Sequence, residues 1–170
     1  MLNEIMLVEL REYLDKYTIN LTHDLTVQET TGYLKTVSTD TTIRESELEH
    51  FIKKTRKKAF SQLLFSFIDK KEVCETDVYK KAGIDRRHFS KIRSANYRIG
   101  KNTVISLVLA LKLNKKEAEE LLNAAGYSLS DSDTFDLIIQ YFLEKKIYDI
   151  LTVNQALDYF SLKPLSVILE

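Results

Sequence analysis

The stretch KKAGIDRRHFSKIRSANYR, residues 80–98, gathers seven Lys or Arg side chains and one acid around a single glycine. Glycine readily adopts the left-handed backbone that a tight turn between two helices requires. Gly83 is therefore expected to form such a turn, followed by Ile84 as a buried anchor. Asp85 is a good N-cap residue, so we expect a second helix over residues 86–94.

The expected helix 86–94 has one apolar face. Phe89 and Ile92 are three residues apart and point inward together, which leaves the cations for the other faces. Arginine near the start of such a helix can read guanine in the major groove, and flanking polar side chains can contact phosphates. The candidate DNA-binding residues are Arg86, Arg87, Lys91, Arg93, Ser94, Tyr97, Arg98 and Lys101.

Length and composition favour one helical protein. The chain has 170 residues, of which 44% are hydrophobic, with one proline and four glycines, too few for a β-rich sandwich. The single cysteine, Cys74, cannot form an internal disulfide, which suits a reducing cytosol. We find no signal peptide and no apolar run near the ~18 residues of a membrane span. The expectation is a mostly all-α cytoplasmic protein without a membrane segment.

The formal net charge of zero hides a strong asymmetry along the chain. Residues 1–50 carry a net charge of −6, residues 51–101 a net of +10, and residues 102–170 a net of −4. A segment this basic creates a local field whatever the total charge is. It either binds a polyanion or forms a solvated surface that pairs with the acidic flanks.

Apolar periodicity and turn signals divide the N-terminal part. The i, i+3, i+4 pattern predicts an amphipathic helix over residues 1–17. Residues 18–42 contain nine threonines and predict either a short β-hairpin or an irregular connector. The spacing of Ser46 and Glu49 matches a capping box, so a helix over about 46–71 is expected to start there.

Shorter helices are expected in the rest of the chain, over about 75–82, 86–94, 102–112, 115–124, 133–146 and 152–162. Gly126 is expected to end one helix and Asp133 to cap the next. The apolar side chains between 135 and 143 either complete the core or form a dimer interface. The resulting division is a small N-terminal segment (1–45), a helical domain (46–126) and a C-terminal helical extension (127–170).

Residues 59–124 resemble the five-helix domain of phage-repressor-type (Xre-like) helix-turn-helix regulators. The resemblance rests on DVYKKAGIDRRHFSKIRS and KNTVISLVLALKLNKKEAEELL. Together with GYSLSDSDTFDLIIQYF, the region 59–165 is also similar to a C-terminal module of some bacterial multidomain proteins, including ones with a macrodomain. The resemblance implies that Arg86, Arg87 and Lys91 contact bases and that Ser94 meets a phosphate.

The chain departs from the repressor pattern at the first helix of the motif. Tyr79 occupies a position where the family usually has a small residue, and Glu75 and Asp77 lie where the helix start normally approaches a phosphate. Acids at that place repel DNA unless they cap the helix or face sideways.

Two functions are therefore expected from the sequence. The first is a DNA-binding transcriptional regulator that acts as a homodimer on double-stranded DNA through the helix 86–94. The alternative is a non-enzymatic adaptor for a protein partner on a repressor-like fold, for example in a bacterial or phage defence or counter-defence system. We expect no enzymatic activity, no cofactor and no metal, since His23, His50 and His88 lack partners at ligand spacing.

Overall fold

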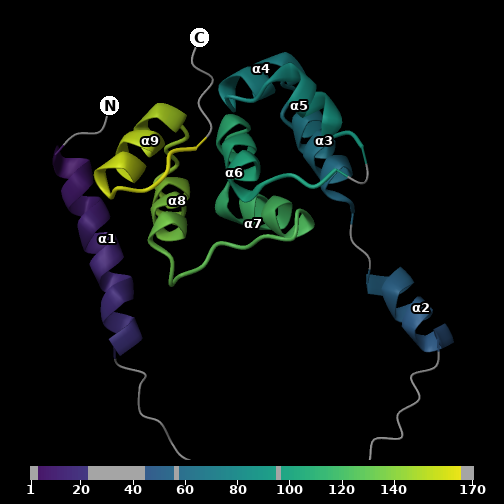
Figure 1. Cartoon of the computed structure of the whole chain (residues 1–170), viewed down its shortest axis with the longest axis horizontal. Helices are drawn as coiled ribbons and strands as arrows, with labels where there is room; N and C mark the ends of the chain where they lie inside the picture. Colours follow the sequence, from purple (N-terminus) through teal and green to yellow (C-terminus); the bar gives the residue numbers. More distant parts are fainter. Residues whose placement is uncertain (1–3, 23–44, 56–57, 95–96, 166–170) are drawn as a thin grey trace, which may run out of the picture.

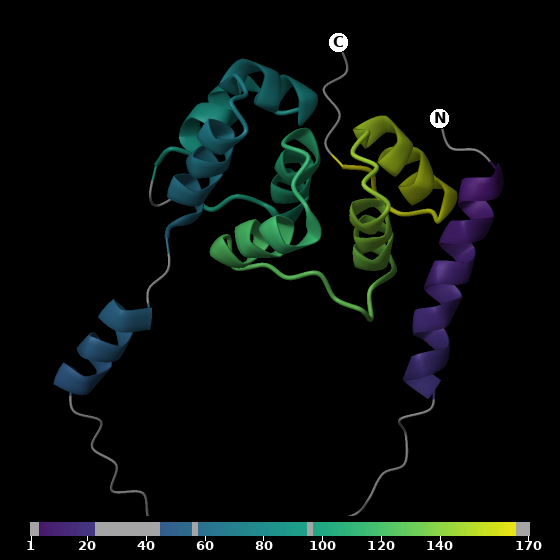
Figure 2. The ribbon, with the colours of Figure 1, turned by 180° about the vertical axis from the view of Figure 1, so that it is seen from behind.

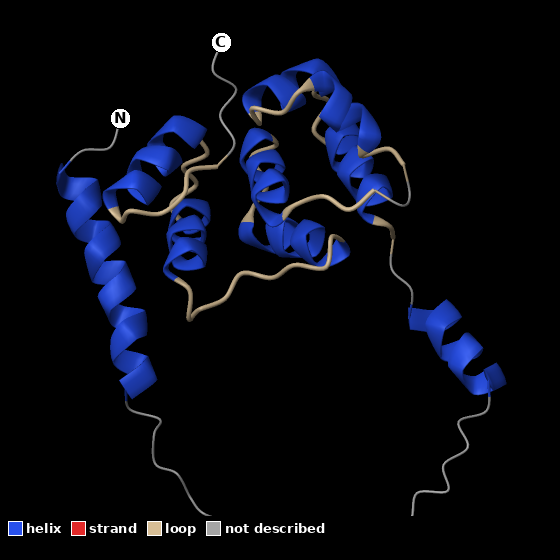
Figure 3. Ribbon diagram, in the orientation of Figure 1, coloured by secondary structure: helices blue, strands red, loops and turns tan. Residues whose placement is uncertain are grey.

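The computed structural model describes residues 4–22, 45–55, 58–94 and 97–165 (Figure 1). All regular secondary structure in these residues is helical (Figure 3), so the all-α expectation is confirmed. The helices are α1 (Glu4–Thr22), α2 (Glu45–Thr55), α3 (Phe60–Lys70), α4 (Glu75–Lys81), α5 (Arg86–Lys91), α6 (Lys101–Ala110), α7 (Lys115–Ala124), α8 (Thr134–Glu144) and α9 (Ile150–Tyr159).

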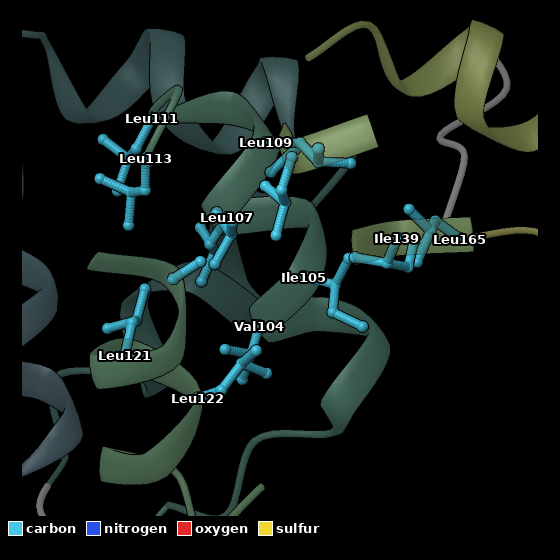
Figure 4. Packing of buried hydrophobic residues seen from close by; sticks show 14 of the residues in the cluster. Val104, Ile105, Leu107, Leu109, Leu111, Leu113, Leu121, Leu122, Ile139 and Leu165 are labelled. Atoms are coloured by element: carbon cyan, nitrogen blue, oxygen red, sulfur yellow. The ribbon is translucent and has the colours of Figure 1, made fainter. Parts of the chain in front are cut away.

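Helix α6 lies at the centre of the core. Its side chains are buried at every position from 103 to 109, because α4, α7 and α9 all pack against it. A helix that is apolar on all sides is stable only when neighbours surround it. In Figure 4, Val104 lies beside Leu122 of α7. Ile105 points toward Ile139 of α8 and toward Leu165, which follows α9. One core therefore joins the middle and C-terminal parts of the described chain.

The core residues expected for the middle of the chain are confirmed. Ile84, Phe89 and Ile92, which the sequence pattern placed inward, are each at most 3% exposed, and so are Val104, Leu107, Leu111 and Leu122. Gly126 has a φ of +81° directly after α7, and the Asp133 side chain accepts a hydrogen bond from the Asp136 N–H at the start of α8. The stop and the cap that the sequence indicated are therefore both present.

Helix α8 is buried between α1 and α9 (Figures 1 and 2). Its side chains from 136 to 143 are all buried, so its apolar residues complete the core of a single chain. Leu10 and Leu14 of α1 belong to the same core, although the sequence assigned them to a separate N-terminal segment. Periodicity indicated that α1 buries one face, but it could not indicate that α8 covers that face.

Polar contacts reinforce the packing of α1 against α8. The Glu9 carboxylate accepts hydrogen bonds from Lys145 Nζ at 2.8 Å and from the Tyr141 hydroxyl at 3.1 Å. The Lys145 ammonium and the Tyr141 hydroxyl lower the pKa of Glu9. Burial, with the nearby Glu9 charge, raises the pKa of Tyr141 to about 12. The ring of Tyr13 meets that of Tyr141 edge-on at 5.3 Å.

The expected single helix over 46–71 is wrong, because the structure contains two helices, α2 and α3, separated by a non-helical Lys58 and Ala59. The sequence KKTRKK, residues 53–58, begins in the last turn of α2 and places like charges four residues apart, which destabilises a continuous helix. Helix α2 begins at Glu45, so Ser46 lies inside its first turn and is not its N-cap.

Smaller differences concern the remaining boundaries. Helix α1 continues to Thr22, past the expected end at residue 17, and the rest of the expected hairpin or connector lies outside the described residues. Helix α9 begins at Ile150 because Asp149 caps it, accepting a hydrogen bond from the Thr152 N–H at 3.0 Å. In the described ranges, none of the helices combines the length and the apolarity needed to cross a bilayer.

Candidate nucleic-acid interface

The turn between α4 and α5 is built by backbone hydrogen bonds around Gly83, which has a φ of +64°. The Gly83 N–H donates to the Lys80 carbonyl at 3.1 Å, and the Ile84 N–H donates to the Tyr79 carbonyl at 2.9 Å. This pair of bonds is a Schellman motif, which ends α4 and requires a left-handed residue at the position of the glycine. The Asp85 carboxylate then accepts the Arg87 N–H at 2.7 Å and starts α5.

Helix α5 divides its side chains between the core and the solvent. Phe89 is 3% exposed, with its ring 5.6 Å from that of Tyr79, and Ile92 directly after the helix is also buried. Tyr79 therefore packs against Phe89 at the position where repressor-type domains usually have a small residue. The solvent-facing side chains of α5 are Arg86, Arg87, Ser90 and Lys91.

Arg93, two residues after α5, is attached to the start of α4. Its guanidinium forms an ion pair with the Glu75 carboxylate and lies 5.2 Å from the centre of the Phe65 ring. The Arg93 side chain is still 58% exposed. The acid that sequence analysis placed against DNA is thus neutralised from within the chain, whereas Asp77 in the same first turn is exposed. No sequence spacing indicated this pair.

An open pocket of about 450 Å³ lies between α4 and α5. Its lining combines two arginines and one carboxylate with aromatic rings and hydroxyl groups: Glu75, Thr76, Tyr79, Arg86, Phe89, Ser90 and Arg93. The pocket gives the candidate interface a concave, mostly polar centre with two cations at its edge.

The candidate residues that follow α5 differ in their exposure and in whether a carboxylate already pairs with them. Ser94 and Arg98 are exposed, and Tyr97 is 37% exposed with its ring meeting the His88 ring edge-on. Lys101 instead donates to Asp136 at 2.6 Å, and that carboxylate is 2% exposed. The charge of Lys101 therefore stabilises the contact between α6 and α8. Sequence reasoning missed Asp136 because a single acid 35 residues away gives no signal of its own.

The part of the chain that the structure describes contains no cluster of three or more His, Cys, Asp or Glu side chains suited to a metal ion. Comparison with protein-family models, curated proteins and solved structures found no match to the chain. The resemblance of residues 59–124 to repressor-type domains therefore stays an expectation from the sequence.

Proposed function

We propose that the chain is a DNA-binding transcriptional regulator in which α4 and α5 act as a helix-turn-helix and α5 enters the major groove. The observation that carries the proposal is the division of α5 into a buried Phe89 and a solvent-facing row of Arg86, Arg87 and Lys91. An arginine in the major groove can donate two hydrogen bonds to guanine. The net charge of +10 over residues 51–101 supports an attraction to phosphates.

The exposed cations have two roles in this proposal. Arg86, Arg87 and Lys91 face the base edges, while Arg98 and the polar residues Ser94 and Tyr97 lie at phosphates, which position the protein without specifying a sequence. Lys101 is not included, since its charge is already compensated by the buried Asp136. Arg93 contacts a phosphate only when DNA displaces the Glu75 carboxylate from its guanidinium.

The test is a fluorescence anisotropy titration of the chain with random duplex DNA at several salt concentrations, followed by selection of a preferred sequence. We expect Arg86→Ala or Arg87→Ala to cost about 1–3 kcal/mol on the preferred sequence and to relax preference at one base pair. We expect Arg98→Ala to weaken binding to all sequences equally and to reduce the salt slope by about one unit.

Lys116→Ala is the matched control, because it removes one exposed cation from α7 and leaves α4 and α5 unchanged. An isotherm that stays flat up to ~100 μM, the weak edge of non-specific association, would falsify the DNA proposal. The exposed Asp77 on α4, which repels DNA phosphates, favours the second candidate function in that case, a module that binds a protein partner.

A further inference from the structure

Helix α2 is an amphipathic helix whose apolar face is uncovered. Every side chain from 46 to 55 is exposed, and in Figures 1 and 2 the helix lies apart from the others. Leu48 is 49% exposed, Phe51 is 64% exposed and Ile52 is 45% exposed. Their spacing of three and four residues places them on one side of the helix.

An exposed stripe on so short a helix needs a partner. Helix α2 has 11 residues, and isolated helices below about 12–15 residues are only marginally stable in water. Helices α1 and α8 gain stability by burying their stripes against each other, whereas no described part of the chain covers that of α2. Burial of the stripe in an intermolecular contact would stabilise α2 itself.

The charges of α2 indicate which molecule covers it. Glu45, Glu47 and Glu49 lie in its first half, and Lys53 and Lys54 lie in its last turn. This order suits the helix dipole, but the carboxylates of Glu47 and Glu49 and the two lysine ammonium groups form no ion pair with another described residue. Two such helices in antiparallel orientation place the acidic half of each beside the basic half of the other. A parallel pair places like charges together.

We propose that the partner of α2 is the α2 helix of a second copy of this chain, packed antiparallel about a two-fold axis. Such an interface is isologous, so one self-complementary surface serves both protomers. The contact is small compared with the roughly 1,200–2,000 Å² that stable interfaces bury, so we expect a dimer that exchanges with monomer at micromolar concentrations. The proposal requires no DNA and does not depend on the proposed function.

The first experiment is sedimentation velocity on the full chain without DNA, from ~1 to ~500 μM. We expect a concentration-dependent dimer whose dissociation constant rises at least tenfold in Phe51→Asp. Leu151→Asp is the matched control, since Leu151 of α9 is 63% exposed and lies outside α2. Far-ultraviolet circular dichroism checks that each variant keeps the helical content of the rest of the chain.

The second experiment uses charge complementarity, which a change in folding cannot imitate. One variant carries E47K and E49K, which leaves Glu45 as the one acid of α2 beside four lysines, and the other carries K53E and K54E, which makes the helix acidic throughout. We expect each variant to be monomeric alone and a one-to-one mixture to form a heterodimer.

Three outcomes would overturn the proposal. A wild-type chain that stays monomeric at every concentration would mean that a different molecule covers α2. A mixture of the two charge variants that does not associate would remove the antiparallel pairing. A dimer that Leu151→Asp disrupts and the α2 variants do not would place the interface on α9.

Discussion

At the scale of single residues, the ion pair between Glu75 and Arg93 determines how much positive charge the surface formed by α4 and α5 offers to a ligand. Arg93 is held against α4 by the carboxylate of Glu75 and against α3 by the ring of Phe65. Because the pair is largely exposed, its own contribution to stability is small, and its main effect is on the charge available to a ligand.

We expect Glu75→Gln to strengthen DNA binding about two- to fivefold, because it removes a negative charge from the interface and frees Arg93 for a phosphate. The salt slope should also increase by about one unit. Salt-titrated anisotropy measures both. Glu120→Gln, which removes an exposed acid from α7, is the control. Weaker binding by Glu75→Gln would instead show that the pair serves to align α4 with α5.

Local chemistry made part of this site predictable. Gly83 and Asp85 interact only with backbone groups a few residues away, so the turn and the cap could be inferred from sequence alone. Glu75 and Arg93 are 18 residues apart, and Lys101 and Asp136 are 35 apart. Whether such groups meet depends on how helices cross, which no local pattern encodes. The candidate cations could therefore be named from the sequence, but their ion-pair partners could not.

At the scale of elements, apolar periodicity predicted where helices form, but it did not predict which helices contact each other. The structure places α7 against α3, and the charge network between them centres on Glu117. Glu117 accepts hydrogen bonds from Lys70 Nζ at 3.0 Å and from the Asn114 N–H at 3.1 Å. Burial opposes ionisation, but Lys70, Asn114 and Lys71 together outweigh it and hold the pKa of Glu117 below its usual value.

A lowered carboxyl pKa stabilises the folded chain above the unfolded value of about 4.3, and this stabilisation is lost as the pH falls through the lower folded value. We expect Glu117→Gln to reduce the free energy of unfolding by about 0.5–1 kcal/mol at pH 7, a small value because Lys70 is largely exposed. Glutamine can still serve the capping box, so helix α7 keeps its start.

Urea denaturation at neutral pH and at a pH of about 3 tests this, because the difference between variant and wild type should shrink at the acidic value. The control is Glu119→Gln, at an exposed position of the same helix. Equal destabilisation by Glu117→Gln at both pH values would contradict the ionic explanation.

At the scale of the whole molecule, helices distant in sequence share one core. An amphipathic stripe indicates that a face is buried but not which element covers it, so the contact of α1 with α8 could not be predicted. Leu10 of α1 is fully buried, while Val8 on the same helix is 55% exposed.

We expect Leu10→Ala to lower the free energy of unfolding by about 2–5 kcal/mol, as truncation of a buried leucine does. Val8→Ala should change it by less than about 0.5 kcal/mol, as exposed substitutions usually do. Thermal or urea unfolding followed by circular dichroism distinguishes the two. A Leu10→Ala chain with an unchanged main transition would show that α1 is not part of the cooperative unit.

The pairing of α1 with α8 also has a consequence for the order of events during protein synthesis. Glu9 and Tyr141 are 132 positions apart. At typical elongation rates of about 5–20 residues per second, the ribosome needs roughly 7–26 seconds to reach the second after the first. During that interval the apolar side of α1 has no native partner to bury it. The nascent chain therefore carries an aggregation-prone α1 until α8 emerges.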